Sequence, residues 1–324
     1  MPKHLYCVIS REGGDVKISA DCAYLVPYRD IALVVKESPL INYASLPRDT
    51  LVRHLASHQS LIEGVMEECT AVPIKFGTTA VDDGELVEIL ESGYPCFKNA
   101  VDSMAGKTEV DLIALWNDLD SVLRDLGRRG EIRRFREGIE AGSPDILREQ
   151  AVELGKMVRT ALEEENTRLR DEIVTSLDQF ILEQRLREHF DDRMLMNVAV
   201  LIRREEKGAL DERIEELDRK YGGMMNFRVI GPLPPHSFST LEIRRIGARE
   251  MEEAMRLAGV KMGASPDDLK ESYRKLLRSY HPDKNPGDSN AQERFERFNE
   301  AYGILSDCHV TPGGRDAIMV RVVR

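Results

Sequence analysis

The sequence predicts an α+β protein with two ferredoxin-like α+β domains, a long helical segment between them and a small all-α helical hairpin after them. Over residues 1–117, strand-length apolar runs alternate with two helical patterns, and residues 118–190 are helical in character almost throughout. A strand–helix–strand order returns over residues 191–246. Residues 248–308 carry two apolar helical stripes, and a tail follows over residues 309–324.

Composition limits the classes of function. Hydrophobic residues make up 42 % of the 324 residues and charged residues 32 %, a balance that suits a soluble protein with a folded core. The formal net charge of −11 and the isoelectric point near 5.3 argue against a nucleic-acid-binding protein, whose phosphate contacts require a basic surface.

Five cysteines are scattered along the chain, and none forms a CxxC pair: Cys7, Cys22, Cys69, Cys96 and Cys308. An odd number without metal-type spacing predicts reduced thiols in a cytosolic protein. Charged residues begin too early for a signal peptide, and the longest apolar run, residues 31–35, is far shorter than the roughly 20 residues that span a bilayer. We therefore expect a cytoplasmic protein without a membrane segment, metal or cofactor.

The first domain is predicted from its periodicities. Apolar residues every three or four positions predict an amphipathic helix over residues 45–69, with Pro47 near its start, and a second helix over residues 83–104. A short strand and a loop are expected between residues 16 and 28. The clearest strand-length runs are KHLYCVIS (3–10), RDIALVVKES (29–38), AVPIKFGTTA (71–80) and EVDLIALW (109–116). This rhythm indicates helices packed on one face of a sheet.

The helical segment is split into two helices at Gly142-Ser143-Pro144. The apolar stripe of its second helix consists of Leu154, Val158, Leu162, Leu169, Ile173, Leu177 and Ile181. An arm packed against the sheet domains and a self-associating coiled coil both fit such a stripe. The lack of a sustained heptad favours the packed arm.

The second domain is predicted from three consecutive elements. MLMNVAVLIRR (194–204) is a strand, ALDERIEELDRKYG (209–222) a helix that stops at Gly222-Gly223, and MNFRVIGPL (225–233) a strand. This order matches that of the first domain.

A helical hairpin is predicted near the C-terminus. Met251 to Ala258 form a short helix, and Ser265-Pro266-Asp267-Asp268 then starts the first long one with a capping box. Ser289 with Gln292 can cap the next. The residues expected to join the two helices in one core are Leu269, Tyr273, Leu276, Phe295, Phe298, Tyr302 and Leu305, with Leu277 and Tyr280 on the first stripe.

The connection between these helices contains His281-Pro282-Asp283. Pro282 ends the first helix, so His281 and Asp283 lie on the tip of the hairpin. Nothing in the sequence supplies a nucleophile or oxyanion donors for a catalytic dyad, and loop capping is the simplest structural role.

LKESYRKLLRSYHPDKNPGD followed by RFERFNEAYGILSD, within residues 250–307, resembles the J domain of DnaJ-type co-chaperones. The resemblance implies that His281, Pro282 and Asp283 stimulate ATP hydrolysis by a DnaK-type chaperone. It also implies a docking face for that chaperone: Lys270, Arg274, Lys275 and Arg278. A merely solvated helix face is the alternative for these four residues.

The sequence departs from the J-domain pattern after Asp307. A short basic fourth helix is usual in that family, whereas CHVTPGGRDA predicts a turn. The final AIMVRVVR is expected to be an added edge strand or disordered.

Two further stretches stand out in the first 247 residues. AVPIKFGTTA lacks the G-K-[ST] sequence that grips phosphate, which argues against a nucleotide site there. FRVIGPLPPHSFSTLEI (227–243) contains prolines that forbid a helix and remove strand donors, so a rigid extended corner is expected.

Together these stretches resemble the gas vesicle protein F/L family. Its P-x-[RK]-F-G-T strand ending corresponds to Pro73, Phe76, Gly77 and Thr78, with Ile74 and Lys75 between. Its G-P-W-P-P-Y-S-F corner corresponds to Gly231, Pro232, Pro234, Pro235, Ser237 and Phe238, with Leu233 and His236 in place of the usual aromatics. The resemblance covers nearly all of residues 1–245.

The two resemblances imply a gas vesicle assembly factor or minor vesicle component, and no enzyme. Its expected partners are the hydrophobic gas vesicle shell subunit, other gas vesicle accessory proteins and a DnaK-type ATPase chaperone, with no nucleic acid or membrane. Its expected location is the cytoplasm and the gas vesicle. The body would bind the shell subunit while the hairpin recruits the chaperone.

Three other interpretations stay open. The chain could be a general J-domain co-chaperone with another client, but it lacks the Gly/Phe-rich linker and the CxxCxGxG zinc modules that many general co-chaperones have. A metalloenzyme could use His54 and His58 on one helix face, but Leu55 stands where an H-E-x-x-H motif needs glutamate, so surface histidines are the better account. His189 with Asp191 and Asp192 is equally well a solvated helix end. In the third interpretation, the J-like domain is a purely structural module.

Overall fold

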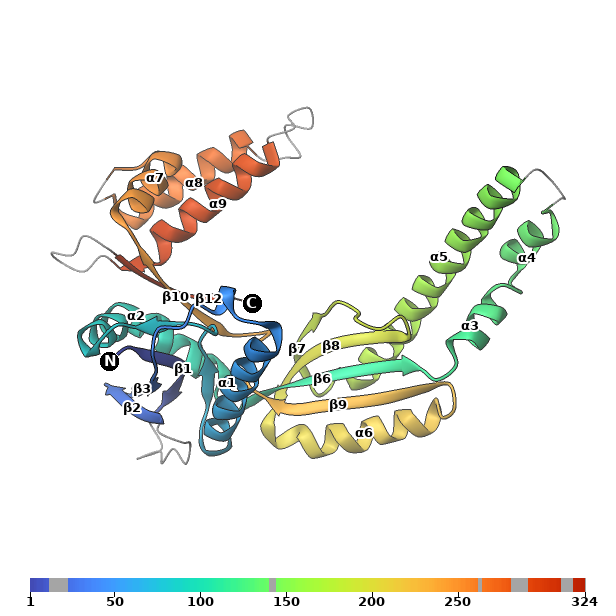
Figure 1. Cartoon of the computed structure of the whole chain (residues 1–324), viewed down its shortest axis with the longest axis horizontal. Helices are drawn as coiled ribbons and strands as arrows, with labels where there is room; N and C mark the ends of the chain where they lie inside the picture. Colours follow the sequence, from blue (N-terminus) through green and yellow to red (C-terminus); the bar gives the residue numbers. More distant parts are fainter. Residues whose placement is uncertain (12–22, 140–143, 262–263, 281–290, 310–316, 324) are drawn as a thin grey trace. The chain divides into compact units, whose positions relative to one another are not determined.

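The structure, a computed structural model, describes residues 1–11, 23–139, 144–261, 264–280, 291–309 and 317–323 (Figure 1). The chain divides into two compact units, which we describe separately. Unit 1 combines residues 1–105 with residues 239–324, and unit 2 consists of residues 106–238. The predicted α+β class, with antiparallel sheets and a helical C-terminal region, is confirmed.

Unit 1 contains a five-stranded antiparallel sheet with strand order β2-β3-β1-β4, and β5 also pairs with β1. Its strands are β2 (Ala23–Tyr28), β3 (Ile31–Glu37), β1 (Lys3–Ser10), β4 (Ala71–Pro73) and β5 (Thr79–Ala80). Helices α1 (Arg48–Glu68) and α2 (Asp83–Met104) pack against it, and a short 3₁₀ helix η1 (Tyr43–Ser45) precedes α1. β3 is buried over five consecutive residues, so both faces of this strand are covered, which explains its uninterrupted apolar run.

Unit 1 also contains a three-stranded antiparallel sheet of order β10-β12-β11. β10 (Thr240–Ile246) pairs along its whole length with β12 (Ala317–Val323), and β11 spans Cys308–His309. Between β10 and β11 in the sequence lie α7 (Ala248–Ala258), α8 (Pro266–Tyr280) and α9 (Ala291–Asp307). The helical domain formed by α7, α8 and α9 is therefore inserted between β10 and β12, which pair with each other.

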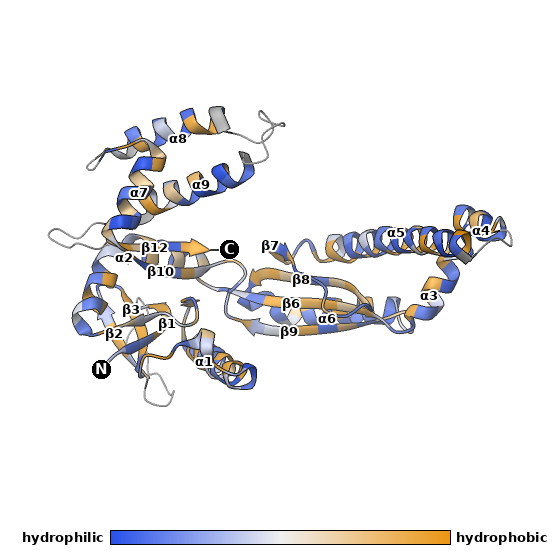
Figure 2. Ribbon diagram, turned by 45° about the horizontal axis from the view of Figure 1, so that its top comes forward, coloured by the Kyte–Doolittle hydropathy of each residue, from blue (hydrophilic) through white to orange (hydrophobic). Residues whose placement is uncertain are grey.

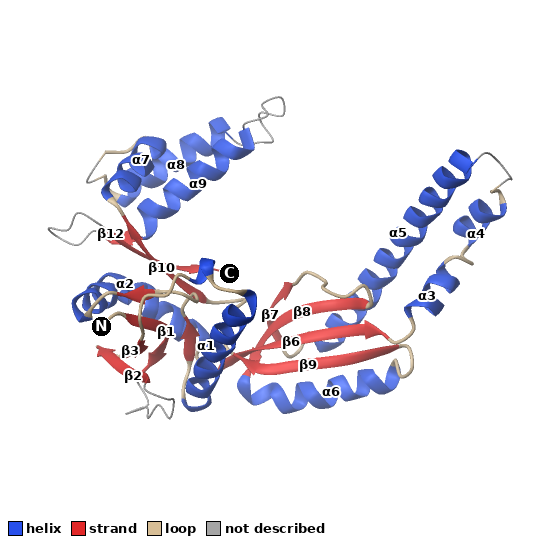
Figure 3. Cartoon of the chain, viewed as in Figure 1, coloured by secondary structure: helices blue, strands red, loops and turns tan. Residues whose placement is uncertain are grey.

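Unit 2 is built on a four-stranded antiparallel sheet of order β7-β8-β6-β9 (Figure 3). Its strands are β7 (Ile181–Leu186), β8 (Met194–Arg203), β6 (Lys107–Trp116) and β9 (Met225–Leu233). Its helices are α3 (Leu119–Leu126), α4 (Gly130–Glu137), α5 (Pro144–Leu177) and α6 (Lys207–Lys220), with a 3₁₀ turn η2 (Arg204–Glu206) before α6. Apolar residues of β6, β8, α6 and the C-terminal part of α5 form one core. β8 is hydrophobic along most of its length (Figure 2).

The structure corrects several assignments made from the sequence. β6 was expected to close the first domain, but it pairs with β8 and β9 in unit 2. Residues 181–186, expected to be helical, form β7, whose alternating burial fits an edge strand. The partners of β6 lie on distant segments and β7 pairs with the next strand along the chain, and local periodicity reveals neither pairing.

Two further differences concern residues 71–80 and the tail. The single strand expected over residues 71–80 is two short strands, because Gly77 adopts a left-handed conformation with φ of 86° and turns the chain between them. The tail strand β12 is the middle strand of its sheet instead of an edge strand, with Ala317 to Val320 all buried. Within the described ranges, no helix is long and apolar enough to cross a bilayer.

Candidate functional site

The hairpin of α8 and α9 is held together by aromatic side chains. Tyr273 stacks on Tyr302, with ring centroids 4.1 Å apart, and on Phe298 at 5.4 Å. Leu269 and Phe298 are buried, and Leu276 and Leu305 pack against them as partly buried neighbours. Phe295, also expected in this core, is half-buried. The stripes expected from helical spacing therefore lie on facing sides of the two helices.

A reciprocal capping box starts α8. The backbone N–H of Asp268 donates to Ser265 Oγ at 3.2 Å, and the backbone N–H of Ser265 donates to Asp268 Oδ2 at 3.0 Å. The Ser265 hydroxyl also donates to Asp268 Oδ2 at 2.7 Å, and this bond, followed by the one from the Ser265 backbone N–H, lowers the pKa of the Asp268 carboxyl below its usual value. The cap satisfies two donors that a helix start leaves unpaired, which fixes where α8 begins.

The four residues expected to dock a chaperone are all exposed on α8: Lys270, Arg274, Lys275 and Arg278. Lys275 forms an ion pair with Glu271 at 2.8 Å, one helical turn away. The opposite side of α8 carries the packed residues Leu269, Tyr273 and Leu276. His281, Pro282 and Asp283 lie outside the described residues. α8 thus has one basic exposed side and one apolar packed side.

The base of the helical domain shares a core with the β10–β12 sheet. Ile246 of β10 and Ala317 and Met319 of β12 pack with Ala254 of α7 and with Ala301 and Ile304 of α9. β12 also contacts α2, where a Cβ atom built on Gly93 would lie 2.8 Å from Val320 Cγ2. The helical domain is joined to the rest of unit 1 by packing and by both ends of its chain.

The first family motif, residues 73–78, forms a tight turn between β4 and β5. Thr78 Oγ1 donates to the carbonyl oxygen of Lys75 at 2.6 Å, and Gly77 supplies the left-handed conformation. The backbone N–H of Lys75 donates to the carbonyl of Leu241 at 2.9 Å, and Lys75 Nζ lies 2.6 Å from Glu242 Oε1. The motif therefore connects the first sheet of unit 1 to β10.

Phe76 of this motif lies in a cluster of aromatic and imidazole rings. The other members are His4, Tyr6, Tyr43, His54 and His58. His58 is only 6 % exposed and stacks on Tyr6, so the expectation of two surface histidines is wrong for this residue. No local pattern signals the burial of His58, because its partners come from β1 and from the 73–78 turn.

A hydrogen bond joins His4 Nε2 and His58 Nδ1 at 3.3 Å. Burial, and secondarily the neighbouring His54, lower the pKa of His4 to about 4. Within the described part of the chain, no three histidine, cysteine, aspartate or glutamate side chains are grouped so that they could hold a metal ion. The rings of His4, Tyr43 and His58 pack around Phe76 of the motif.

The second family motif forms the end of β9 and the corner after it. Gly231 precedes a cis peptide bond to Pro232 and has φ of 150°. A Cβ atom on Gly231 would lie 3.0 Å from the backbone oxygen of Glu109, so the close approach of β9 to β6 requires glycine. Pro234, Pro235 and Phe238 are buried, which agrees with a packed, extended corner.

Ser237 of this corner belongs to a buried ionic network. Its backbone N–H and its Oγ donate to the two carboxylate oxygens of Glu109, each at 2.8 Å. Arg187 donates to Glu109, to Ser237 and, at 2.7 Å, to Asp111 Oδ2. Burial raises the pKa of both Glu109 and Asp111, against the opposing effects of Ser237 and Arg187. Burial, with Arg187 nearby, also lowers the pKa of His236 to about 4.

Comparison with known families assigns both parts of the chain. The family model described as "Gas vesicle synthesis protein GvpL/GvpF" matches residues 2–240, and the DnaJ domain model matches residues 256–309. The crystal structure of the gas vesicle protein GvpF from Anabaena sp. PCC7120 superposes with a TM-score of 0.60 at 17 % identity, covering 73 % of this chain and 97 % of that one. GvpF from Microcystis aeruginosa gives 0.58 at 16 % identity, with 73 % and 98 % covered. At these identities the likeness shows the fold.

The helical domain is similar to part of the curated chaperone proteins named DnaJ. The protein from Paramagnetospirillum magneticum is 53 % identical over 51 residues, which is 16 % of this chain and 13 % of that protein. The one from Chlamydia abortus is 59 % identical over 49 residues, 15 % of this chain and 12 % of that protein. The chain therefore spans only a small part of these relatives.

Proposed function

Since the chain belongs to the GvpL/GvpF family of gas vesicle synthesis proteins and carries a DnaJ domain, we propose that it is an assembly factor with a built-in co-chaperone. Residues 1–245 hold the hydrophobic shell subunit of the gas vesicle. The helical domain brings a DnaK-type chaperone to that subunit and stimulates ATP hydrolysis by the chaperone. The proposal assigns no enzymatic reaction to the chain itself.

The chaperone part of the proposal rests on α8, which has one basic exposed side and one apolar packed side. Lys270, Arg274 and Arg278 are exposed, while Tyr273 and Phe298 stack in the hairpin. Exposed cations on a well-packed helix attract an acidic partner surface without loss of the fold that presents them. The tripeptide His281-Pro282-Asp283 follows α8 directly in the sequence. Asp283 is chemically suited to a charge-assisted hydrogen bond with an arginine of the chaperone.

The shell-subunit half is supported by family membership and by the solubility problem that such a subunit creates. A small subunit with a large apolar surface aggregates before assembly unless another protein covers that surface. A chain that both holds this client and recruits a chaperone delivers the two together. The helical domain shares the core formed by Ile246, Ala301 and Met319 with the β10–β12 sheet, which supports joint delivery because the domain is not a loosely tethered appendage.

The test is co-capture of purified shell subunit by the full chain, with a DnaK-type chaperone and ATP present or absent. We expect the wild type to bind the shell subunit and to stimulate ATP hydrolysis by the chaperone. His281→Gln and Arg274→Glu should keep shell-subunit binding and lose most of the stimulation. Arg219→Glu is the matched control, because it makes the same charge change at an exposed position on α6.

Each half of the proposal can fail separately. If the shell subunit is not captured while unrelated unfolded proteins are kept from aggregating, the chain is a general J-domain co-chaperone. If Arg274→Glu and Arg219→Glu stimulate the chaperone equally, α8 is not its docking face. If the wild type itself gives no stimulation, the helical domain serves a structural role.

A further inference from the structure

The first half of α5 and the helices α3 and α4 form an arm beyond the sheet of unit 2 (Figure 1). We define the arm as residues 119–139 and 144–165. Leu169, Ile173 and Leu177, which follow it, are buried in the sheet core, but Leu154 and Val158 are only partly buried. α3 and α4 both contact α5. The arm therefore has its own helix–helix packing and is not needed to cover the sheet.

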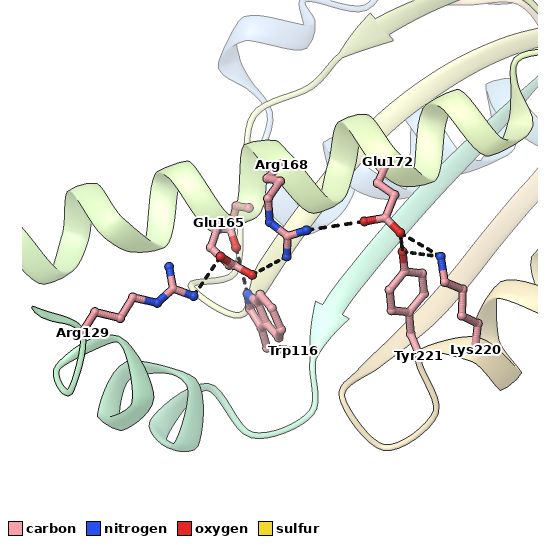
Figure 4. A network of polar contacts seen from close by, with 8 residues as sticks. Trp116, Arg129, Glu165, Arg168, Glu172, Lys220 and Tyr221 are labelled. Carbon is pink, nitrogen blue, oxygen red and sulfur yellow. Dashed lines mark hydrogen bonds and ion pairs between the residues drawn. The ribbon is translucent and has the colours of Figure 1, made fainter.

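Polar contacts fix the arm at its base (Figure 4). Trp116 Nε1 donates to Asn166 Oδ1 at 2.9 Å. Glu165 accepts from Arg168 at 2.6 Å and from Arg129, at the start of α4, at 2.9 Å. The same arginines lower the pKa of the Glu165 carboxyl, Arg168 more than Arg129. These contacts hold α4 against α5 in one arrangement.

A groove of about 770 Å³ lies between α5 and the pair α3–α4. Apolar side chains in the groove include Leu123 of α3 and Leu154 and Val158 of α5. Three arginines also line it, namely Arg124, Arg128 and Arg136, and all three are exposed. A groove of this size accepts a few apolar side chains of a partner, with cations placed around them.

The α3–α4 side of the groove is opposite in charge to the whole protein, whereas the α5 part of the arm, residues 144–165, has three basic and six acidic residues. Residues 119–137 contain six arginines and four acidic residues, a net charge of +2, whereas the chain carries −11. Asp120 is the carboxylate that lines the groove. Arg124 lies 4.0 Å from Asp118 and Arg128 is paired with Asp125 at 3.0 Å, but the side chain of Arg136 has no hydrogen bond or ion pair with any residue that the structure describes. The Arg136 side chain can therefore pair with an acidic group of a ligand.

We propose that this groove binds an amphipathic helix of another protein, apolar on one side and acidic along its flanks. The apolar side of that helix packs on Leu123, Leu154 and Val158, and its carboxylates face Arg124, Arg128 and Arg136. Docking of an amphipathic helix into a groove between helices is a common mode of recognition, and the arginines select acidic helices over basic ones. This inference goes beyond the proposed function, because it names a second binding site, separate from α8, and does not require the shell subunit as its occupant.

A second copy of the chain is a poorer occupant. Ile146, Leu147 and Val152 are exposed apolar residues near the start of α5, among Asp145, Glu149 and Glu153. Val152 comes six positions after Ile146 and five after Leu147, which places it about 120° and about 140° from them around a helix with 3.6 residues per turn. They do not form one stripe that could enter the groove.

The test uses two fluorescent synthetic helical peptides with the same leucines at i, i+4 and i+7, one flanked by glutamates and the other by lysines. We expect the full chain to bind the glutamate peptide, with affinity that falls as salt rises, and to bind the lysine peptide at least about tenfold more weakly, a difference of about 1.4 kcal/mol. Equal binding of the two peptides overturns the proposal.

Charge reversals on α4 then locate the site. Arg136→Glu should weaken binding of the glutamate peptide about tenfold, whereas Arg134→Glu, on the same helix but not among the groove-lining residues, should change it less than about twofold. Thermal unfolding of both variants, followed by circular dichroism, verifies that each is folded. Equal effects of the two reversals overturn the assignment. Dimerisation of the chain in sedimentation experiments, abolished by Arg136→Glu, also overturns it, because the occupant would then be a second copy.

Discussion

Ser237 holds both carboxylate oxygens of the buried Glu109, one through its backbone N–H and the other through its hydroxyl, across 128 positions of the sequence. Glu109 is 1 % exposed, so the hydrogen bonds replace water that the carboxylate has lost. Arg187 supplies the positive charge, shared with Asp111, whose Oδ1 atom is buried without a hydrogen-bond partner among the described residues. A serine in the second family motif thus has a physical role that the motif alone did not reveal.

Ser237→Ala should destabilise unit 2 by about 1–3 kcal/mol, because it removes one donor from a buried carboxylate. Trp116, the one tryptophan of the chain, lies in the same unit and reports its unfolding by fluorescence in urea. The control is Ser239→Ala, in unit 1, and circular dichroism follows the unfolding of both variants. Ser239 Oγ is buried and has no hydrogen-bond partner among the described residues, so its loss should cost nothing measurable by circular dichroism. Similar losses for the two variants would contradict the role of the Ser237 hydroxyl.

The buried His4 and the half-buried His236 should make the protein less stable in mild acid. His4 and His236 have pKa values near 4 in the fold, against about 6.5 when unfolded, so the unfolded chain binds more protons between these two values. The free energy of unfolding is therefore unaffected by these two histidines above pH 6.5 and decreases as the pH falls toward 4. Glu109 and Asp111, whose pKa values are raised, act in the opposite direction as the pH falls.

NMR titration of the imidazole Cε1–H signals measures the histidine pKa values directly. In His4→Gln, the hydrogen-exchange protection factors of β1, which correct for the intrinsic pH dependence of exchange, should change less between pH 7.5 and pH 5 than in the wild type. A pKa of His4 close to 6.5 would show that burial in the ring cluster does not disfavour the protonated form of His4.

Gly93 of α2 should be intolerant of any side chain. A Cβ atom there would lie 2.6 Å from the Phe97 ring and 2.8 Å from Val320 of β12, so Gly93→Ala overpacks the contact between α2 and the tail strand. We expect a loss of about 1–3 kcal/mol, together with faster hydrogen exchange in β12.

Gly155 offers the comparison, because it also lies inside a helix, but apart from its chain neighbours and its own helix backbone no atom of the described residues lies within 4 Å of the position that a Cβ atom would take. Gly155→Ala should stabilise α5 by about 0.5–1 kcal/mol. If both alanines stabilised the chain, β12 would not pack as tightly on α2 as the structure indicates.

Phe298→Ala should unfold or strongly weaken the helical hairpin. Phe298 is 5 % exposed and stacks on Tyr273, and removal of a buried aromatic side chain costs about 3–5 kcal/mol. Phe295→Ala, on the same helix, should cost clearly less, since that side chain is only half-buried. Hydrogen exchange in α8 and α9 separates the two cases, and equal protection in both variants would argue against an aromatic core centred on Tyr273.

Local patterns in the sequence determined much of this protein. The helical spacing of Tyr273, Phe298 and Tyr302 predicted two facing helices, and Ser265 with Asp268 predicted where the first begins. The prolines from Pro232 to Pro235 predicted an extended corner. Such features depend on residues within one or two turns of one another, or on fixed backbone angles, so they can be recognised without knowledge of the fold.

Only the tertiary structure decided which distant segments pair. The residues of β6 predict a strand in either unit, and it lies in unit 2 because β8 and β9 supply its hydrogen bonds. β12 pairs with β10, so the chain re-enters the sheet of unit 1 after the helical domain. His58 is buried, although its helical neighbourhood looks exposed, because Tyr6 and Phe76 close over it from other elements. Strand pairing and burial depend on partners tens to more than a hundred residues away, and periodicity carries no information about which partner arrives.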